Sequence, residues 1–386
     1  MSTVASMPPI PAPRSWRERW LSFRNGCVAS PAFQRWAAGF PLTRGIAQRN
    51  TRALFDLCAG FVYSQVLFAC VRLDLFRILQ SGPKSIEDLS RRLGLSPERT
   101  ERLLKAAASL NLVTLLQDGR YALADLGAAL TGNPSVAAMI EHHAMLYADL
   151  ADPVALLRGE AGPTRLGQYW LYADHASLGR ASEEAVAGYS GLMSASQALI
   201  AEDILDAYPL GGHGRLMDVG GGEGAFIAAV ARRHAALRLT LFDLPPVAQR
   251  AAERLAGLGF GARVECLSGS FHTDILPGGA DVISLVRILH DHDDAQAAVL
   301  VQAARDALPP GGTILIAEPL ADTRGAEPIG DAYFGFYLLA MGSGRARTAA
   351  EIRTMLAVGG FTEIQEISTR RPLLTRLITA KRSRNV

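Results

Sequence analysis

A single stretch, residues 216–243, constrains the fold of this chain more than any other. It starts with a short apolar run that ends at Val219, passes through a glycine-rich turn, follows a helical pattern over residues 225–233, and closes with a second apolar run before Asp243. Strand, glycine turn, helix and strand form the repeating unit of nucleotide-binding α/β folds, in which glycines let the backbone approach a ligand at the helix N-terminus. The stretch therefore predicts a doubly wound α/β domain with a ligand site at this turn.

The spacing of the glycines bears on which ligand the turn would take. A dinucleotide site has the pattern G-x-G-x-x-G, whereas this chain has Gly220-x-Gly222-x-Gly224, with acidic residues at Asp218 and Glu223. Carboxylates beside the turn would repel a pyrophosphate but would suit a cofactor that carries a cationic amino group. The pattern favours S-adenosylmethionine; a dinucleotide site and an α/β turn without a ligand are the alternatives.

Composition sets broad limits on the chain. Its 386 residues are enough for two domains, and 49% hydrophobic against 20% charged residues indicates a folded, rather apolar protein. A net charge of +2 argues against wholesale binding of nucleic acid, so no such partner is expected. No metal-ligand spacing links the four cysteines, for which we expect buried free thiols in a reducing cytoplasm: Cys27, Cys58, Cys70 and Cys266.

The sequence shows neither a signal peptide nor an obvious spanning helix. The first residues lack the charged start and apolar core of a signal peptide, and no run reaches the roughly 18 to 20 apolar residues of a spanning helix. Residues 55–71 come closest, but Asp56, Ser64 and Gln65 interrupt them. We therefore expect a cytoplasmic protein in which residues 55–71 form a buried helix.

Residues 1–52 form a distinct N-terminal arm. Residues 1–13 are rich in proline and are expected to be disordered. Arginines and interfacial aromatics on short amphipathic helices suit an anionic membrane surface; an arm that packs on a partner subunit is the alternative. Against the single acid Glu18, the arm carries Arg14, Arg17, Arg19, Arg24, Arg35, Arg44, Arg49 and Arg52, interleaved with Trp16, Trp20, Phe23, Phe33, Trp36 and Phe40.

Residues 53–133 show the pattern of a winged helix. Ser85 is expected to cap a helix that Gly94 ends, Ser96 begins the next helix, and residues 112–123 predict a hairpin wing. Helix-turn-helix geometry can bind DNA, so a transcriptional regulator with a degenerate catalytic domain is an alternative of another class. The acids of the second helix nearly balance its bases, which is poor for phosphate contact, and a structural winged helix is favoured.

Residues 134–210 are predicted to be helical and to border a pocket. His142 and His143 lie in apolar surroundings, but adjacent histidines on a helix point about 100° apart and cannot chelate one metal together. We expect hydrogen-bonded helix packing or a pocket wall at these histidines. Further candidates for the wall of a large apolar pocket are Tyr147, Trp170 and Met193.

From residue 211 to residue 386, predicted strands and helices alternate. This alternation is typical of a Rossmann-like, mostly parallel doubly wound sheet, whose ligand lies at the carboxyl ends of the strands. The predicted strands are residues 216–219, 237–243, 264–268, 281–286 and 313–317, followed by an antiparallel pair near 362–368 and 374–381.

Polar and aromatic residues follow the strands at the edge where the ligand is expected. The second strand ends at Asp243, whose carboxylate could take both ribose hydroxyls. The third strand leads to Ser270, which could bond the edge of an adenine, and to Phe271, which could cover its face. The fourth strand leads to Arg287. These residues predict a nucleoside site along the carboxyl edge of the sheet.

His290 is the candidate general base. It follows the apolar fourth strand, and Glu318 ends the neighbouring strand, so this carboxylate could fix the imidazole tautomer and raise its basicity toward an alcohol. One alternative is that His290 caps a helix that starts at residues 291–294. Another is a metal site over residues 290–293, although consecutive side chains diverge too much in direction to ligate one ion well.

Together these motifs resemble those of the dimeric small-molecule O-methyltransferases, which include plant caffeate and flavonoid enzymes and bacterial hydroxyindole-type enzymes. The resemblance covers about residues 53–381. It rests on Asp218-Val219-Gly220-Gly221-Gly222-x-Gly224, Phe242-Asp243-Leu244-Pro245, Gly269-Ser270-Phe271, Leu289-His290-Asp291 and Ala317-Glu318-Pro319.

The resemblance implies roles for individual residues. His290 would be the base, with Glu318 as its orienting partner and Asp291 beside it in the catalytic group. The winged-helix region would build a homodimer and close the neighbour's substrate pocket. The residues that would hold S-adenosylmethionine, with Gly220 facing its methionine moiety, are Asp218, Gly220, Gly222, Asp243, Leu244, Ser270, Phe271 and Arg287.

Two positions depart from the pattern of that family. Ser270 stands where members usually have Asp, so adenine recognition would depend more on Phe271. Many plant members also have a second glutamate in a G-K-E-R-T turn, and here Ala346 takes that place. One carboxylate fewer near the base suits an acceptor less polar than a catechol.

Four segments resemble more closely the carotenoid-pathway O-methyltransferases of purple phototrophic bacteria. These segments are PAFQRWAAGFPLTR, LFDLCAGFVYSQVL, MIEHHAMLYADLADPVALLR and RRPLLTRLI. The resemblance implies methylation of the 1-hydroxyl of an acyclic hydroxylated carotenoid of the demethylspheroidene or hydroxyneurosporene type; methylation of a phenol, hydroxyindole or polyketide is the alternative within the class.

A carotenoid acceptor agrees with two other features of the sequence. A long polyene needs an apolar tunnel, for which the candidates are His142, Tyr147, Trp170, Met193, Phe334, Tyr337 and Met341. Because such a substrate dissolves in a membrane, it also favours peripheral membrane contact by the N-terminal arm.

Overall fold

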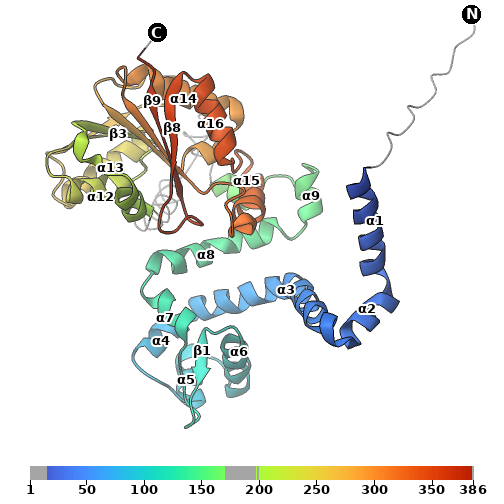
Figure 1. The fold of residues 1–386 in the computed structure, drawn as a ribbon. Helices are drawn as coiled ribbons and strands as arrows, with labels where there is room; N and C mark the ends of the chain where they lie inside the picture. Colours follow the sequence, from blue (N-terminus) through green and yellow to red (C-terminus); the bar gives the residue numbers. More distant parts are fainter. Residues whose placement is uncertain (1–14, 170–196, 198–199, 385–386) are drawn as a thin grey trace, which may run out of the picture. The chain divides into compact units, whose positions relative to one another are not determined.

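The computed structural model describes residues 15–169, 197 and 200–384 (Figure 1). The chain divides between Asp125 and Leu126 into two compact units, and each is described here by itself. The expected disorder of residues 1–13 and the pocket candidates Trp170 and Met193 lie outside the described residues.

The first unit is mainly helical. Its short strands β1 and β2 pair as an antiparallel hairpin. In chain order its elements are α1 (Trp16–Ala29), α2 (Pro31–Gly39), α3 (Pro41–Arg72), α4 (Leu75–Gln80), α5 (Ile86–Leu93), α6 (Pro97–Ser109), β1 (Val113–Leu115) and β2 (Tyr121–Leu123).

Local capping sets the ends of α5 and α6, as the sequence predicts. Ser85 accepts a hydrogen bond from the Asp88 amide at 3.2 Å, and Ser96 accepts one from the Arg99 amide at 3.3 Å. Such side chains satisfy amides that a helix leaves unpaired at its start. Gly94 ends α5 in the left-handed region, with φ of 66°. The two capped helices followed by a hairpin have the order of a winged helix.

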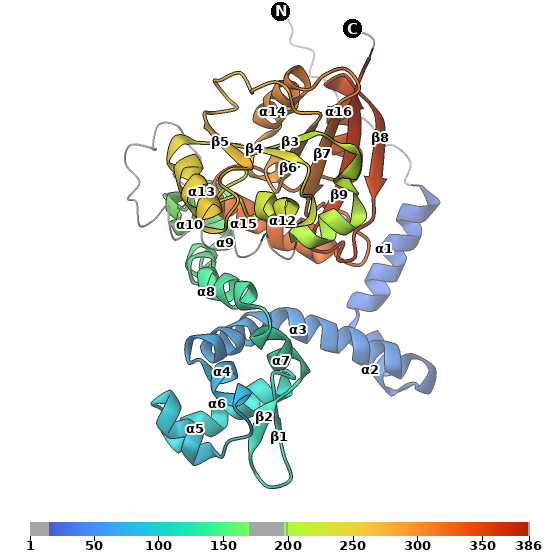
Figure 2. The same cartoon turned by 90° about the vertical axis from the view of Figure 1, so that its left-hand side faces the viewer.

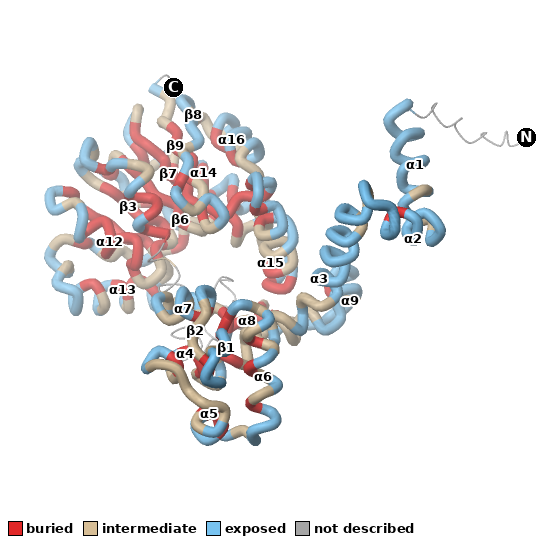
Figure 3. The backbone as a smooth tube through the Cα atoms, turned by 60° about the horizontal axis from the view of Figure 1, so that its bottom comes forward, coloured by how far each residue is buried: buried red, intermediate tan, exposed pale blue. Residues whose placement is uncertain are grey.

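α3 contradicts the expectation that residues 55–71 form a buried helix. Only Cys70 is buried among its residues, while Leu57 is 81% exposed and Phe61 is 72% exposed. Figure 3 shows most of α3 in the colour of exposed residues. By length and composition alone α3 could also cross a membrane, although Asp56, Ser64 and Gln65 interrupt its apolar run as the sequence shows. An apolar composition predicts that a helix face is covered, but not that the same chain covers it.

The burial of each cysteine depends on the helix or strand that carries it. All four are free, but only Cys70 is buried; Cys27 and Cys266 are half-buried, and Cys58 is exposed. The prediction of buried thiols therefore held fully only for Cys70, and it was wrong for Cys58, because that residue lies on the exposed part of α3. Burial raises the pKa of Cys70 to about 12, so this thiol stays neutral.

The second unit begins with helices that precede its sheet. α7 starts at the division between the units, and the segment ends with a short 3-10 turn. The elements are α7 (Asp125–Thr131), α8 (Pro134–Asp149), α9 (Pro153–Leu157), α10 (Arg165–Tyr169), the helical residues 200–207 and the turn Leu210–Gly212.

A seven-stranded sheet in the order β5-β4-β3-β6-β7-β9-β8 forms the centre of the second unit. β3 to β7 are parallel, and β9 runs antiparallel to both of its neighbours. This is the predicted mostly parallel sheet, with each strand within two residues of its expected ends. The strands are β3 (Arg215–Val219), β4 (Arg238–Asp243), β5 (Val264–Ser268), β6 (Val282–Val286), β7 (Thr313–Glu318), β8 (Phe361–Ile367) and β9 (Arg376–Arg382).

Helices cover both faces of the sheet and complete three layers (Figure 2). Residues 200–207, α12 and α13 share one buried cluster with the sheet, in which Phe226 is fully buried. α14 and α16 share a second cluster, with Leu300 at its centre. The helices are α12 (Ala225–Arg233), α13 (Pro245–Gly257), α14 (Asp294–Ala307), α15 (Gly335–Met341) and α16 (Ala349–Val358).

Candidate active site

The turn after β3 has the backbone that its glycines predict. Gly220, Gly222 and Gly224 have φ of 68°, 56° and 75°, a region that other residues rarely adopt. At Gly220 there is also no room for a side chain, because a Cβ would lie 2.6 Å from Cδ1 of Ile288. α12 begins directly after Gly224, so the unpaired amides of its first turn lie beside the end of β3.

Asp218 is a buried carboxylate on β3, next to this turn. Its Oδ1 accepts a 2.6 Å hydrogen bond from the Ser284 hydroxyl, whereas its Oδ2 has no hydrogen-bond partner within the described parts of the chain. Burial raises the pKa of Asp218 to about 7, against the lowering effect of the bond from Ser284. An unpaired buried carboxylate oxygen is costly by itself, so this atom fits a donor or a cation that a ligand brings.

Asp243 ends β4 with its carboxylate turned toward the glycines. Its Oδ2 accepts the Gly222 amide at 2.8 Å and its Oδ1 accepts the Leu244 amide at 2.7 Å. Burial raises the pKa of Asp243 to about 6, although the two backbone hydrogen bonds lower it. The amides orient the carboxylate, and each oxygen keeps a lone pair for a ligand hydroxyl.

Ser270 and Phe271 lie on the loop after β5. Ser270 is buried; its hydroxyl accepts the His272 amide at 3.2 Å, and its own amide donates to Asp274 at 2.8 Å. The Phe271 ring lies 4.4 Å from that of His272 and 5.3 Å from that of His292, centroid to centroid. The sequence did not single out Asp274, which holds this loop in place.

The structure brings His290 and Glu318 together at the carboxyl ends of β6 and β7. His290 lies in a 3-10 turn (Leu289–Asp291), and its Nδ1 is hydrogen-bonded to Oε2 of the fully buried Glu318. Oε1 of Glu318 accepts the amides of Ile288 and Leu289 at 2.8 and 2.7 Å. Glu318 thus orients both the ring and the turn that carries it. The residue that precedes α14 is Asp293, so the alternative of His290 as a helix cap was wrong.

Charges on both sides of the His290 ring set its pKa. Asp291 Oδ1 lies 3.1 Å from Nε2 as an ion-pair contact, without the alignment of a hydrogen bond. Burial lowers the pKa of His290, but the charges of Asp291 and Glu318 outweigh burial and raise it overall. Burial raises the pKa of Asp291 to about 6. Because Glu318 occupies Nδ1, a proton from a substrate would be accepted at Nε2.

An apolar and aromatic wall borders His290. The ring of Phe334 stands edge-on to the imidazole, with centroids 5.9 Å apart. Phe334 ends a π-helical turn (Pro328–Phe334), a rare geometry that is frequent at functional sites. Tyr337 and Met341 on the following α15 are buried in one apolar cluster with Leu146 of α8. Five of the predicted pocket residues, with His142 and Tyr147 on α8 included, therefore belong to α8 and the segment that contains α15.

The two histidines of α8 are tied to tyrosines of this wall. His142 Nε2 lies 2.8 Å from the Tyr337 hydroxyl, and His143 Nε2 lies 2.8 Å from the Tyr333 hydroxyl. Burial lowers the pKa of His142 to about 4 and also lowers that of His143, so both rings are neutral at physiological pH. The expected hydrogen-bonded packing of these histidines is confirmed.

Arg287 lies between the two groups of predicted residues. Its φ of 58° is in the left-handed region, and its amide continues the sheet ladder to the Ala317 carbonyl at 2.8 Å. Its guanidinium carbon lies 6.0 Å from the centroid of the Phe334 ring. The sequence assigned Arg287 to the cofactor, and the structure places its guanidinium near the ring of Phe334.

Arg347 is a residue of this region that sequence reasoning passed over. It is buried, and its guanidinium donates to the carbonyls of Leu289 and His292 on either side of the His290 turn, the latter at 2.7 Å. It also pairs with Asp294 at 2.8 Å. In the sequence, an arginine in an exposed-looking turn beside Ala346 gives no sign that its partners lie more than 50 residues away.

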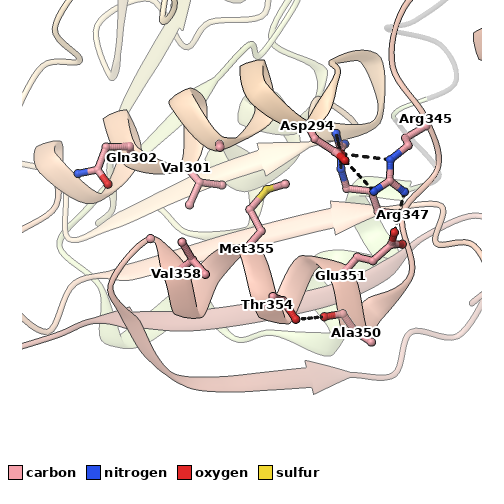
Figure 4. Close-up of a pocket in the computed structure, with 12 residues that line it drawn as sticks. Asp294, Val301, Gln302, Arg345, Arg347, Ala350, Glu351, Thr354, Met355 and Val358 are labelled. Carbon is pink, nitrogen blue, oxygen red and sulfur yellow. Dashed lines mark hydrogen bonds and ion pairs between the residues drawn. The ribbon is translucent and has the colours of Figure 1, made fainter. Parts of the chain in front are cut away.

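A separate cavity of about 530 Å³ lies between α14 and α16. Figure 4 shows Val301, Met355 and Val358 along it, with the Arg345–Asp294 pair at one end. None of the predicted site residues is among the described residues that line it. Arg347, which holds the turn that carries His290, is one of the residues that line it.

Comparisons with known proteins identify the family. The O-methyltransferase domain family matches residues 147–362, and the O-methyltransferase dimerisation domain matches residues 55–133. The demethylspheroidene O-methyltransferase of Cereibacter sphaeroides is 45% identical over 92% of this chain and 93% of its own length. The enzyme of that name from Rhodobacter capsulatus is 42% identical over 89% and 85%.

Solved structures agree on the fold. Mitomycin 7-O-methyltransferase has a TM-score of 0.73 at 24% identity and covers 88% of this chain and 100% of its own. Human N-acetylserotonin methyltransferase, solved in complex with S-adenosylmethionine, has a TM-score of 0.72 at 24% identity, with 86% and 98% covered. The chain belongs to the O-methyltransferase family, and it is an S-adenosylmethionine-dependent O-methyltransferase that carries the family's dimerisation domain.

Proposed function

We propose that this enzyme transfers a methyl group from S-adenosylmethionine to the 1-hydroxyl of an acyclic hydroxylated carotenoid, with His290 as the general base. The observation that carries the proposal is the buried His290–Glu318 pair beside an aromatic and apolar wall. The two relatives above 40% identity, both named demethylspheroidene O-methyltransferase, support the choice of acceptor.

The residues at the carboxyl edge fit the cofactor. Asp243, held by two amides, would take the ribose hydroxyls, and the unpaired Oδ2 of Asp218 would take the cationic amino group. Leu244, Ser270 and Phe271 would surround the adenine. The side-chain-free backbone at Gly220 and Gly222 would pass close to the methionine moiety. When bound, the cofactor supplies an electrophilic methyl group on a positively charged sulfur.

His290 would remove the acceptor's proton as the new bond forms. Glu318 keeps a proton on Nδ1, so the lone pair of Nε2 is free to accept the hydroxyl proton. Asp291, 3.1 Å from Nε2, would stabilise the resulting imidazolium. A tertiary alcohol is a much weaker acid than imidazolium, so proton removal has to accompany methyl transfer, and positioning supplies much of the rate.

The wall beside His290 suits a long apolar acceptor. Phe334, Tyr337 and Met341 present apolar surface, and the polar atoms of His142 and Tyr337 are already bonded to each other. A polar acceptor would have to break such pairs, whereas a polyene would not. Tyr147 and, outside the described residues, Trp170 and Met193 are assigned to the same pocket.

We assign four regions to the chain on the same basis. Residues 1–52 would be an N-terminal arm, 53–133 the dimerisation domain, 134–210 a substrate lid, and 211–386 the catalytic domain. The match to the dimerisation domain supports a homodimer. We place the enzyme in the cytoplasm, with peripheral contact to the membrane that holds its substrate.

The acceptor is tested by offering labelled S-adenosylmethionine with a panel of acceptors. The panel contains 1-hydroxylated acyclic carotenoids in detergent beside catechols and hydroxyindoles. The proposal predicts label in the carotenoid fraction and at most traces in the aromatic compounds. Label confined to the aromatic compounds would keep the O-methyltransferase and refute the carotenoid.

A further inference from the structure

No step of the proposed methyl transfer involves the exposed surface of the N-terminal arm. Trp16 and Phe23 on α1 are 79% and 64% exposed, and Trp36 on α2 is 54% exposed. Figure 3 shows both helices almost wholly in the colour of exposed residues. The match to the dimerisation domain begins only at residue 55, so these helices precede it. Large exposed aromatics of this kind mark a surface that another body covers.

The aromatics of α1 lie on one narrow stripe. Trp16, Trp20, Phe23 and Cys27 follow one another at intervals of four, three and four residues. At about 100° per residue, this spacing puts all four side chains within a sector of roughly 60°. A stripe flanked by polar residues is the pattern of a helix that lies in an interface.

The arginines of α1 flank this stripe. By the same angular spacing, Arg17 and Arg24 lie along one side of it and Arg19 along the other. The long stems of such arginines can cover apolar surface while their guanidinium groups reach outward. In a bilayer, the acyl chains lie beneath the headgroups and the phosphates lie at the surface. The aromatic side chains in the centre of the stripe would therefore face the acyl chains, and the guanidinium groups at its edges would reach the phosphates.

The charge of the arm is strongly one-sided. Residues 15–54 contain seven arginines and one acid, Glu18. Glu18 closes the capping box of α1, since it accepts the Ser15 amide at 2.8 Å. None of these arginines forms an ion pair with any described residue. The positive charge is therefore available to an anionic partner.

The second helix extends the aromatic surface on a defined backbone. The Phe33 ring packs at a tilt on Trp36, and Trp36 stacks on Phe40, the C-cap residue of this helix, with ring centroids 5.6 and 5.1 Å apart. Ala37, on the same helix, is buried, and its carbonyl accepts the Thr43 hydroxyl of α3 at 2.7 Å. In the arm, Ala37 thus packs against α3, while the aromatic side chains of the same helix remain exposed.

We propose that α1 and α2 dock on an anionic lipid bilayer, with the aromatics at the headgroup boundary and the arginines on lipid phosphates. A second copy of the chain is a poorer occupant, because it would bring an arm with the same surplus of arginines. The exposed apolar residues of α3 from residue 55 onward fall within the dimerisation-domain match and are left to the partner subunit. The proposal rests on the arm and holds whichever acceptor the enzyme methylates.

The test is sedimentation of the full-length enzyme with vesicles of phosphatidylcholine, with and without phosphatidylglycerol, at low and high salt. One variant replaces the charges (Arg17→Gln, Arg19→Gln, Arg24→Gln) and another the stripe (Trp16→Ala, Trp20→Ala, Phe23→Ala). A matched control removes three exposed arginines of α5 and α6 instead (Arg91→Gln, Arg92→Gln, Arg102→Gln). Light scattering follows the subunit number of each protein.

We expect wild type and control to bind the anionic vesicles and to release them at high salt. Each arginine near such a surface strengthens binding roughly fivefold, so the charge variant should bind on the order of a hundredfold more weakly; the stripe variant should also lose binding. Wild type that ignores anionic vesicles, or arm variants that bind like wild type, would overturn the proposal. Arm variants that become monomers would show a subunit contact instead. Because vesicle binding needs no turnover, these outcomes are independent of the acceptor.

Discussion

Glu318 acts on His290 in two ways at the scale of single residues. Its hydrogen bond to Nδ1 favours the tautomer that leaves a lone pair on Nε2, as the proposed base needs, and its charge helps to raise the pKa of the imidazole. Its other oxygen holds the Ile288 and Leu289 amides. A glutamine keeps the size of the side chain and an oxygen that can accept the two amides, but it loses the charge. Glu318→Gln therefore tests the effect of the charge on the imidazole.

Glu318→Gln should lower the maximal rate on the order of 10²-fold or more, because the amide no longer favours the productive imidazole tautomer and charge. As the proposed base, His290 works unprotonated, so we expect the rate to fall as pH drops through the His290 pKa. Removing a charge that raises this pKa should move the acid limb of kcat/KM to lower pH. A limb that stays or moves upward would contradict the assignment; Glu351→Gln, in the α16 cap, is the control.

Arg347→Met tests whether the turn that carries His290 needs its guanidinium anchor. The substitution leaves the Leu289 and His292 carbonyls without that donor, and about 2 kcal/mol of stability should be lost because two backbone acceptors lose their charged partner. We expect kcat to fall by roughly tenfold, with the cofactor's Kd nearly unchanged.

Arg345→Gln supplies the matched control for this prediction. Arg345 also pairs with Asp294, and with Glu351 at 2.8 Å, but its side chain is partly exposed and does not contact the His290 turn. Equal losses of kcat in the two variants would mean that Arg347 has no special effect on the base. Chemical denaturation and calorimetric titration of the cofactor complete the comparison.

Some of these residues could be predicted from the sequence and others could not. His290 and Asp243 each follow an apolar strand, and parallel strands of one sheet bring their carboxyl ends to one edge. Arg347 and Asp274 have no such local sign, because their partners are backbone groups fixed only by the folded loops. Contacts to backbone carbonyls and amides do not leave a pattern in side-chain spacing.

The same distinction applies to whole elements. The strands and the α5 and α6 caps were predicted because their signals, an apolar run or a serine before a helix, are contained in the element itself. The exposure of α3 was not, since an apolar helix face shows only that something covers it. Whether the cover is the chain itself or a partner depends on tertiary structure.

Leu57→Asp with Phe61→Asp tests the partner assigned to α3. Both side chains are exposed in the single chain, one helical turn apart, and both lie within the dimerisation-domain match. If a second subunit covers them, two buried carboxylates should dissociate the dimer, which light scattering would show as a halved mass. Val358→Asp, at an exposed apolar position outside that match, should leave the mass unchanged. A stable dimer of the double variant would place the interface elsewhere.

At the scale of the whole molecule, one chain combines a methyltransferase domain, a dimerisation domain and an arm that we propose docks on a membrane. The second unit holds the sheet, the His290–Glu318 pair and the aromatic wall, while the first holds the arm and most of the match to the family's dimerisation domain. A dimer carries two arms, so their weak affinities for a bilayer would combine into a stronger one. An enzyme with a membrane-dissolved acceptor would benefit from that arrangement.

The most direct test of the account compares wild type with His290→Ala in methyl transfer to a 1-hydroxylated acyclic carotenoid. His213→Asn, before β3 at the opposite edge of the sheet, is the control, and calorimetry confirms that each variant binds S-adenosylmethionine. We predict label in the carotenoid with wild type and control, and a loss of about 10²-fold to 10⁴-fold in His290→Ala with cofactor binding intact. Full turnover by His290→Ala would contradict the account.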